Sequence, residues 1–489
     1  MARDRVGIKP LYYYFDGNKF IFSSEIKAIL AHPVPKVIDH EALCHHFRLF
    51  FTPAPFALFK NVFKLRAGHC LSCCQGKLRI EEYWDIPDGL EIKSKGEAAE
   101  GITSLLKDSV KRQIIADRPF GVFLSGGIDS TAVLGLVCDL VGPGVKTYSV
   151  GFEIPPSAAG KFNRDLEYAR ETSRYFGTDH RELLIKDTDA RDHIEKIIWH
   201  LEEPVPNPSQ IPLFLLAREA KKDVAVVLGG NGGDELFGGY SRYYYSKLMD
   251  RYQRIPGIPG KGLLPFFLEQ FSGRRNLKEK LNTPPGTDRF LLFLGQKKKT
   301  LSRILQPPFT EDLTRPFLKR LYLEDKFQDH MKFLMYLDFK TWLPDESILR
   351  FDKTTMANAL EHRVPILDHR LTEFAFRIST DYKVRGKKNS KWIFREAMKA
   401  YLPPHILNKD KRGWFSPGSS WLRGALKDFT YDVLSPDYCP ATRDYFNFPE
   451  IKKILDDHIS GAVYNMFTIW TLLTFQIWHK TFVNGRAKP

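Results

Sequence analysis

Cysteine is scarce in this 489-residue sequence, which contains only Cys44, Cys70, Cys73, Cys74, Cys138 and Cys439. So few cysteines in so long a chain are typical of the reducing cytoplasm and argue against a disulfide-rich secreted scaffold. Two of them, Cys70 and Cys73, have the spacing of a zinc-binding pair, but no second pair with that spacing follows. We therefore interpret them as small apolar residues at the end of a strand.

Signals for secretion and membrane insertion are also missing. Residues 1–10 have no apolar core, so no signal peptide is expected. Residues 462–478 carry no charge, but the run is short for a membrane span and Asn, Thr and Gln interrupt it. A buried C-terminal helix is the better interpretation, and no membrane span is expected.

Charge is strongly unbalanced, with a formal net charge of +15 and an isoelectric point of about 9.3. This excess favours anionic partners such as nucleotides, nucleic acids or membrane surfaces. No RNA-binding or helix-turn-helix signature accompanies it, so we do not expect a nucleic-acid partner. No repeat or long polar tract occurs, and the length allows two or three globular domains.

Residues 1–86 are predicted to be β-rich. Two apolar strands flank Asp16-Gly17, a typical hairpin turn, and a second strand–turn–strand pattern follows at residues 69–84. Residues 87–96 have the composition of a linker. Residues 97–116 then alternate as an amphipathic helix.

From Arg118 onward, strands and helices alternate in units whose length predicts a doubly wound parallel sheet, that is, an α/β fold. The expected strands are residues 121–124, 145–152, 182–185 and 224–228. The expected helices are residues 131–140, 165–176, 194–201 and 211–221. Beyond about residue 240 the pattern is almost wholly helical, so we predict a large helical C-terminal part.

The first chemical motif is Ser-Gly-Gly-Ile-Asp-Ser at residues 125–130, between a strand and a helix. Two glycines let the backbone approach a phosphate, and the helix N-terminus offers free N–H groups. Asp129 would repel a phosphate directly, so it is interpreted as a magnesium ligand. The motif lacks Gly-Lys-Ser/Thr and is therefore not a Walker-type loop.

The second motif follows another buried strand and has six glycines within residues 228–240. Both motifs thus lie at carboxyl ends of strands, where open α/β sheets bind ligands. Asp234 in this motif could share a magnesium ion with Asp129 and clamp the phosphates of a nucleotide.

These two motifs resemble the ATP-pyrophosphatase family, and together they resemble its asparagine synthetase members. Further similar segments follow in family order at residues 145–152, 165–169, 349–376, 388–398 and 411–417. The resemblance implies an adenine nucleotide α-hydrolase-like fold, ATP and Mg²⁺ as cofactors, and an acyl-adenylate intermediate. It also implies a synthetase domain over residues 97–485, preceded by the later part of a glutaminase domain at residues 1–86.

The resemblance also implies roles for individual residues. ATP would be bound by Phe123, Leu124, Ser125, Gly126, Gly127, Asp129, Ser130, Val150, Gly229 and Gly230. The metal ligands would be Asp129 and Asp234. Lys391 would steady the developing phosphate charge, with Arg395 one helical turn further on and on the same face. The charged residues Arg350, Asp352, Glu361, Arg363 and Asp368 are interpreted as structural pairs rather than catalytic groups.

The chain departs from the family pattern in two places. The glutaminase domain of the family begins with a nucleophilic cysteine, which is absent here together with most of the glutamine pocket, so this chain is not expected to hydrolyse glutamine. Asn231 stands where the family has Glu or Asp, and Gly229 replaces the usual Ser. Asn231 is nevertheless assigned to the catalytic set, where its carbonyl can accept a hydrogen bond but cannot take a proton.

The sequence therefore predicts an ATP-dependent amide-forming ligase, with aspartate and ammonia giving asparagine as the first expectation. A related ligase for another carboxylate or a sugar is the alternative, and a weakly active nucleotide-binding pseudoenzyme is the alternative of another class. The expected partners are small-molecule substrates. A complementing glutaminase fragment and a homodimer are left open.

Overall fold

The structure is a computed structural model that describes residues 1–89, 91–155, 160–254, 277–387, 389–409 and 415–485. Lys388 and residues 411–414, which the sequence assigned to family-like segments, lie outside this part of the chain.

The central sheet has five strands, all parallel, in the order β10-β9-β6-β7-β8. Their bounds are Phe120–Phe123 (β6), Lys146–Phe152 (β7), Asp179–Ile185 (β8), Val226–Leu228 (β9) and Glu361–Arg363 (β10). The chain begins the sheet at β6, adds β7 and β8 on one side, and then adds β9 and β10 on the other. Ligands of open α/β sheets bind at such a reversal of strand order, which here falls between β6 and β9.

Four of these strands were expected from the sequence, and each lies within a few residues of its predicted place. The fifth, β10, is a three-residue exception to the prediction that the chain beyond residue 240 is almost wholly helical. It has only three residues, two of them charged at neutral pH, so no alternation of apolar residues announces it. It is extended because it pairs with β9, with Arg363 opposite Leu228.

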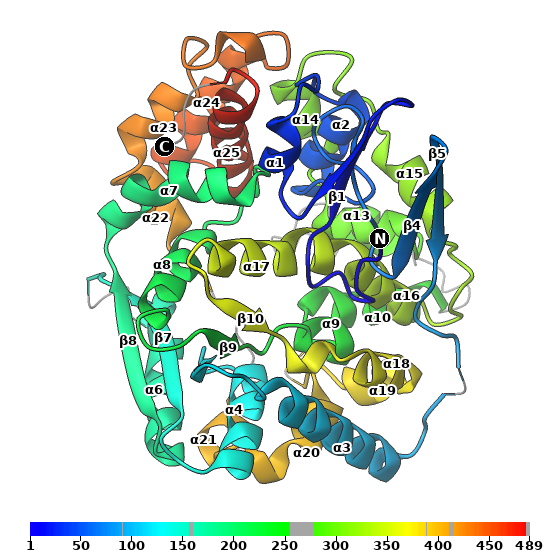
Figure 1. Cartoon of the computed structure of the whole chain (residues 1–489), viewed down its shortest axis with the longest axis vertical. Coiled ribbons are helices and arrows are strands. Elements are labelled where there is room, and N and C mark those ends of the chain that lie inside the picture. Colours follow the sequence, from blue (N-terminus) through cyan, green and yellow to red (C-terminus); the bar gives the residue numbers. More distant parts are fainter. Residues whose placement is uncertain (90, 156–159, 255–276, 388, 410–414, 486–489) are drawn as a thin grey trace.

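Helices cover the sheet on both sides. In Figure 1, α8 (Gln210–Ala220) and α17 (Ile348–Met356) lie above β9 and β10, and α3 (Lys95–Gln113) and α4 (Ile128–Val141) lie below. Two further helices, α6 (Arg164–Phe176) and α7 (Asp187–Leu201), complete the strand–helix alternation. The helix α6 ends where Gly177 adopts a left-handed conformation, with φ of 63°.

The N-terminal part contains the predicted hairpin, with β1 (Tyr12–Phe15) antiparallel to β2 (Phe20–Ser23). A third strand, β3 (Val62–Lys64), pairs with the other side of β1, and β4 (His69–Cys74) and β5 (Lys77–Glu82) form the second predicted hairpin. Two helices that the β-rich interpretation missed are α1 (Ile26–Leu30) and α2 (His40–Leu49).

The segment after these strands is more ordered than a linker. Ile92 is buried, and its N–H donates to the carbonyl of Arg377 at 2.7 Å, which makes a short parallel bridge to Ile378. The helix α3 begins at Lys95, within the residues expected to form the linker.

In the part of the remaining chain that the structure describes, the regular elements are helices apart from β10. Its α-helices are α9 (Gly233–Phe237), α10 (Ser241–Arg254), α12 (Leu277–Asn282), α13 (Thr287–Leu294), α14 (Lys298–Ile304), α15 (Thr314–Leu321), α16 (His330–Leu337), α18 (His369–Arg377), α19 (Thr380–Lys383), α20 (Trp392–Ala397), α21 (Pro404–Leu407), α22 (Gly418–Arg423), α23 (Lys427–Val433), α24 (Phe448–Ile459) and α25 (Met466–Phe482). A π-helix, Asp338–Ser347, runs directly into α17.

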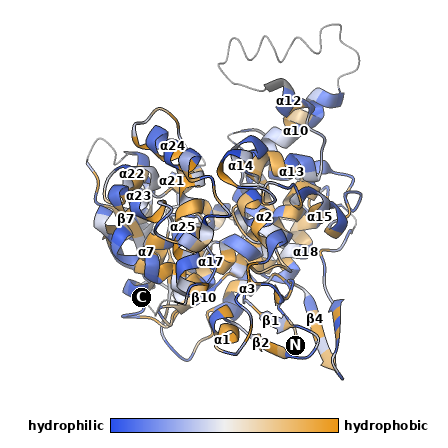
Figure 2. Cartoon of the chain, turned by 90° about the horizontal axis from the view of Figure 1, so that it is seen from above, coloured by the Kyte–Doolittle hydropathy of each residue, from blue (hydrophilic) through white to orange (hydrophobic). Residues whose placement is uncertain are grey.

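The uncharged C-terminal run forms a buried helix, as predicted. Figure 2 shows hydrophobic residues on α25, which packs against α7, α22, α23 and α24. Trp470 and Trp478 of this helix are fully buried. Across the described residues, every helix is either too short or too polar to span a bilayer.

Buried ion pairs tie the N-terminal strands to the rest of the molecule. The Lys64 ammonium contacts the Glu203 carboxylate at 2.7 Å, and Tyr12 donates to the same carboxylate at 3.0 Å. The neighbouring Glu202 carboxylate pairs with Lys353 and accepts the backbone N–H of Ile26 at 3.0 Å. Such pairs are costly to break from one side, because the partner left behind is an unpaired buried charge.

Replacing Lys64 should therefore destabilise the whole chain. We expect Lys64→Met to lower the free energy of unfolding by about 3 kcal/mol, measured by urea unfolding, because Glu203 loses its cation. The matched control is Arg79→Ala, which removes an exposed pair with Glu81 and should cost less than about 1 kcal/mol. Equal midpoints for the two variants would contradict the stabilising role of the buried pair.

Candidate active site

The two glycine-rich motifs meet at the end of the sheet, after the neighbouring strands β6 and β9. We call residues 124–127 the first loop and residues 229–232 the second loop. A Cβ atom placed on Gly230 would lie 2.5 Å from the backbone nitrogen of Ser130, so the second loop packs directly against the start of α4. The predicted proximity of these motifs is therefore present in the structure.

The first loop is held in shape by its own serines. The Ser130 hydroxyl accepts the N–H of Ser125 at 3.1 Å and lies 3.0 Å from the Ser125 hydroxyl. Gly126 has φ of +67°, and a Cβ there would lie 2.2 Å from the carbonyl oxygen of Asp165. Only glycine fits this turn, which leads into the N-terminus of the 14-residue helix α4.

A buried ammonium lies between two carboxylates at the junction of the loops. Lys391 Nζ is 2.5 Å from Asp129 Oδ2 and 2.7 Å from Asp234 Oδ1, and the lysine side chain is only 1% exposed. Asp129 belongs to the first turn of α4, Asp234 to α9, and Lys391 precedes α20. Residues more than 250 positions apart in the sequence thus form one charged group.

Glycines leave the room that this group needs. A Cβ on Gly233 would lie 2.2 Å from Asp129 Oδ1, and a Cβ on Gly239 would lie 1.7 Å from Asp234 Oδ1. A side chain at either position would push a carboxylate away from Lys391. The glycine-rich composition of the second motif is thus explained in part by packing against charged side chains.

The electrostatics of the group follow from its burial. Burial alone would lower the pKa of the Lys391 ammonium, but Asp129 and Asp234 outweigh this effect and raise the pKa above its usual value. Lys391 is therefore charged at every physiological pH. Burial, with the nearby charge of Asp234, raises the pKa of Glu235 to about 7, and Tyr240 donates a hydrogen bond to this carboxyl group at 2.6 Å.

The carboxylates suit a hard divalent cation. Asp129 Oδ1 is buried and has no hydrogen-bond partner among the described residues, which leaves an oxygen ligand available at the junction. Within the described part of the chain, no group of three or more His, Cys, Asp or Glu side chains could hold a metal by itself. This donor set fits Mg²⁺, which usually takes one or two carboxylates and completes its shell with phosphate oxygens and water.

The residues expected to surround adenosine lie at the same edge of the sheet. Phe123 ends β6, Val150 lies on the adjacent strand β7, and Gly229 follows β9. The neighbour of Val150, Ser149, donates its hydroxyl to the carbonyl of Leu124, which links the first loop to β7.

Arg395 is placed differently from Lys391. Its guanidinium donates to the carbonyls of Ile406 at 3.0 Å and Leu407 at 2.7 Å, and so holds the end of α21. Burial lowers its pKa, and the charge of Asp129 opposes this effect, so Asp129 is near enough to act on it. The contacts present favour a positioning role.

Lys409 is a site residue that the sequence did not single out. Its ammonium donates to the carbonyl of Gly126 at 2.9 Å and to Asp165 at 2.5 Å, and it lies over the ring of Tyr168. It thus fixes the first loop at Gly126. The only sequence signal was a basic residue two positions before the similar segment 411–417.

The charged residues of the similar segment 349–376 pair as structural groups, although mostly with partners outside the set. Arg350 pairs with Glu346 at 2.9 Å, and Asp352 pairs with Lys9 at 2.5 Å. Within the set, Glu361 pairs with Arg363 at 2.8 Å.

Comparison with protein families agrees with this geometry. A family model described as "Asparagine synthase" matches residues 101–480, which include both loops and Lys391. The chain belongs to the asparagine synthase family. A second model, described as "Glutamine amidotransferase domain", matches residues 1–84 of this asparagine synthase family member.

Three relatives are similar to half of the chain or more. "Asparagine synthetase [glutamine-hydrolyzing] 1" of Bacillus subtilis is 31% identical over 496 residues, which cover 100% of this chain and 76% of that protein. "Putative asparagine synthetase [glutamine-hydrolyzing] 2" of Methanocaldococcus jannaschii is 39% identical over 52% of this chain and 49% of that protein. "Amidase chry2" of Gibberella zeae is 27% identical over 87% of this chain and 68% of that protein.

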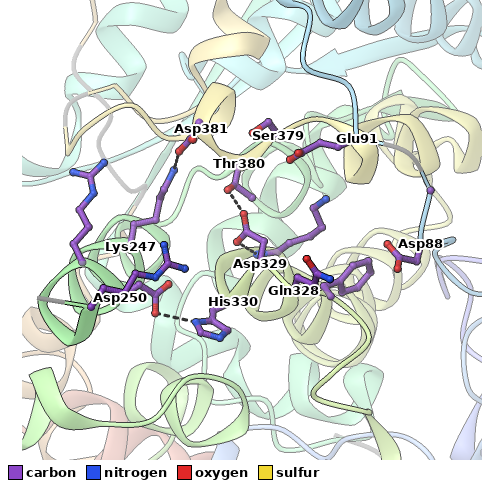
Figure 3. A pocket seen from close by; sticks show the side chains of 15 residues that line it. Asp88, Glu91, Lys247, Asp250, Gln328, Asp329, His330, Ser379, Thr380 and Asp381 are labelled. Carbon is purple, nitrogen blue, oxygen red and sulfur yellow. Dashed lines mark hydrogen bonds and ion pairs between the residues drawn. The ribbon is translucent and has the colours of Figure 1, made fainter. Parts of the chain in front are cut away.

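A second cavity, of about 650 Å³, is built from charged side chains that the two loops do not contribute. Figure 3 shows Lys247 paired with Asp381, Thr380 paired with Asp329, and His330 paired with Asp250 around it. The fully buried Lys383 is close enough to Asp329 and Lys332 of this cavity for their charges to act on it, and its ammonium has no hydrogen-bond partner among the described residues. Burial, and then the like charge of Lys332, lower the pKa of Lys383 to about 7.

This lysine should make stability depend on pH. Its pKa is lower in the folded chain than in the unfolded chain, so the unfolded chain binds more protons between pH 7 and about 10.5, and stability rises with pH across that window. We expect Lys383→Met to stabilise the chain in urea unfolding at pH 6.5, by up to about 1.4 kcal/mol per pKa unit, and to have much less effect at pH 10. The exposed Lys36→Met is the control, and an equal gain at both pH values would contradict the assignment.

Proposed function

We propose that this chain activates a carboxylate with ATP and transfers the acyl group to ammonia. Membership of the asparagine synthase family makes it a carbon–nitrogen ligase, and ATP-dependent amide formation is the reaction class of that family. The observation that carries the proposal is Lys391 between Asp129 and Asp234, beside a glycine-rich loop at a helix N-terminus. The doubly wound, adenine nucleotide α-hydrolase-like description of the sheet is part of the proposal and is supported by its strand order.

Different residues of the chain are proposed to bind the nucleoside, the phosphates and the metal, and to stabilise the leaving group. Phe123, Val150 and the backbone of Gly229 and Gly230 form the nucleoside side of the site, and the first loop with α4 receives the phosphates. Mg²⁺, held by Asp129 and Asp234, would neutralise phosphate charge when bound. The Lys391 ammonium is fixed and desolvated, so it stabilises the negative charge that grows as pyrophosphate leaves.

Aspartate is the proposed carboxylate, because the similar proteins of Bacillus subtilis and Methanocaldococcus jannaschii are named asparagine synthetases. A second candidate is another carboxylate or a sugar substrate. Asn231 in place of a carboxylate, Gly229 in place of Ser, and the similarity to an amidase favour it. The pseudoenzyme alternative is opposed by the intact group around Lys391, which a chain without catalysis has no need to bury.

The nitrogen source is a further part of the proposal. Residues 1–84 match a glutamine amidotransferase domain, but the first cysteine is Cys44, which is buried in α2 and whose pKa burial raises to about 12. We propose that the 489-residue chain uses ammonium directly and uses glutamine only with a complementing glutaminase fragment. The division into residues 1–86 and 97–485 and a cytoplasmic location are proposed on the same basis as in the sequence analysis, and a homodimer is left open as it was there.

The deciding experiment is pyrophosphate release by the purified chain with Mg·ATP. We expect release that requires both aspartate and ammonium and that glutamine cannot support. ATP binding is measured in parallel by calorimetry. Release with another carboxylate in place of aspartate would move the assignment to the second candidate, and ATP binding without release on any carboxylate would favour the pseudoenzyme.

Lys391→Ala should abolish most of this activity. We expect kcat to fall by about 10²–10³, because a preorganised cation at the leaving phosphate is lost. Lys391→Arg, which keeps the charge, should retain more activity, and Lys107→Ala on the exposed face of α3 is the control. Circular dichroism and thermal unfolding verify that each variant is folded. An alanine variant with more than half of the original kcat would exclude the proposed role.

A further inference from the structure

His362 lies buried behind the second loop, on the strand that the sequence did not predict. It is 3% exposed, in the middle of β10, and its backbone pairs opposite Val227 of β9. Its ring is stacked between Phe351, at a centroid distance of 5.1 Å, and Phe123, at 6.2 Å. Two aromatic rings thus fix the plane of the imidazole, and they fix it beside the residue that ends β6.

The polar edge of this ring points at Gly229. A Cβ atom on Gly229 would lie 2.3 Å from His362 Nε2 and 2.9 Å from Asn231 Oδ1. No side chain fits at position 229, because Nε2 and the amide oxygen already occupy that space. Glycine at position 229 and histidine at position 362 are therefore complementary, because the imidazole occupies the space that a side chain at position 229 would need.

The Nε2 atom is buried and has no hydrogen-bond partner among the described residues. An unpaired buried polar atom lowers stability, so such atoms call for an explanation, and a ligand that pairs with the atom is one. His362 is close to the site, since it contacts both Phe123 and the space over Gly229. A ligand at the end of β6 and β9 is thus the natural partner.

The position of His362 indicates which part of the ligand it meets. Beyond Gly229, Gly230 packs against Ser130 and Asp129 and Gly233 packs against Asp129, so the chain leads from there towards the phosphates and the metal. His362 faces Gly229, one residue earlier, on the side of Phe123 and the nucleoside. Burial lowers the pKa of His362 to about 3, so the ring is neutral and suits a hydroxyl group better than a phosphate.

We propose that Nε2 of His362 hydrogen-bonds a ribose hydroxyl of bound ATP, supplying from β10 the polar contact that a side chain at position 229 cannot make. This inference rests on the proposed ATP binding and deepens it. His362 is a specificity-determining residue for the nucleotide, and Nε2 can lie where it does only because position 229 has no side chain.

Nucleotide analogues test the contact directly. Binding of ATP, 2′-deoxy-ATP and 3′-deoxy-ATP is measured by calorimetry for the unmodified chain and for His362→Ala. We expect one deoxy analogue to bind the unmodified chain about tenfold more weakly than ATP, the equivalent of about 1.4 kcal/mol. We expect His362→Ala to bind ATP about tenfold more weakly and to lose that discrimination.

The outcomes separate the two proposals. If the unmodified chain binds no ATP, the proposed function fails. If it binds both deoxy analogues as tightly as it binds ATP, the ribose contact is overturned while the proposed function stands. Equal weakening of all three nucleotides by His362→Ala would show a purely structural histidine. The comparison of ATP with its deoxy analogues on the unmodified chain tests the ribose contact even if His362→Ala does not fold.

A second pair of variants tests the complementarity of positions 229 and 362. Gly229→Ser should weaken ATP binding strongly, because its Cβ collides with Nε2. The double variant Gly229→Ser, His362→Ala removes the collision and should bind ATP at least fivefold better than Gly229→Ser alone. Additive losses would overturn the pairing. His46→Ala is the matched control, since His46 is 1% exposed, also has an unpaired Nε2, and lies in α2 of the N-terminal part.

Discussion

The charged group of Lys391, Asp129 and Asp234 is the interaction on which the arrangement of the site depends. Its three members come from the start of α4, from α9 and from the residue before α20, so the group brings three separate chain segments together. Each charge is buried or half-buried and would be costly without the others. The close packing of Gly230, Gly233 and Gly239 around it follows from the same requirement.

Much of this could be predicted from the sequence, because the relevant signals are local. The strands β6 and β9 are short apolar runs, β7 and the end of β8 contain further apolar residues, and the segments after β6 and β9 have clustered glycines with serine or aspartate. The place of Asp129 and Asp234 just after carboxyl ends of strands followed from the strand–loop–helix pattern, whereas the pairing of β6 with β9 is seen only in the structure. A role for Lys391 could be predicted only through the family resemblance, because a single lysine next to a helix has no sequence pattern that indicates a function.

The features that could not be predicted depend on contacts between distant segments. The strand β10 exists because β9 offers it an edge, and its three residues have no pattern of their own. Lys409 is recognisable only once Gly126 and Asp165 are seen beside it. In the sequence, His362 is simply a histidine between two charged residues. Its place beside the site is recognisable only when Gly229 is seen against its ring.

The buried pairs Lys64–Glu203 and Lys353–Glu202 have a consequence for the unfolding of the molecule. Lys64 ends a strand of the N-terminal sheet, whereas Glu202 and Glu203 follow α7, and Lys353 lies in α17, which leads towards β10 and the second loop. Separating the first strands from the rest of the molecule would leave unpaired charges in an apolar interior. The free energy of local opening there is therefore close to that of global unfolding. Amide protons of the β1–β3 ladder should thus exchange with solvent at the slow rates of the central sheet, as one cooperative unit.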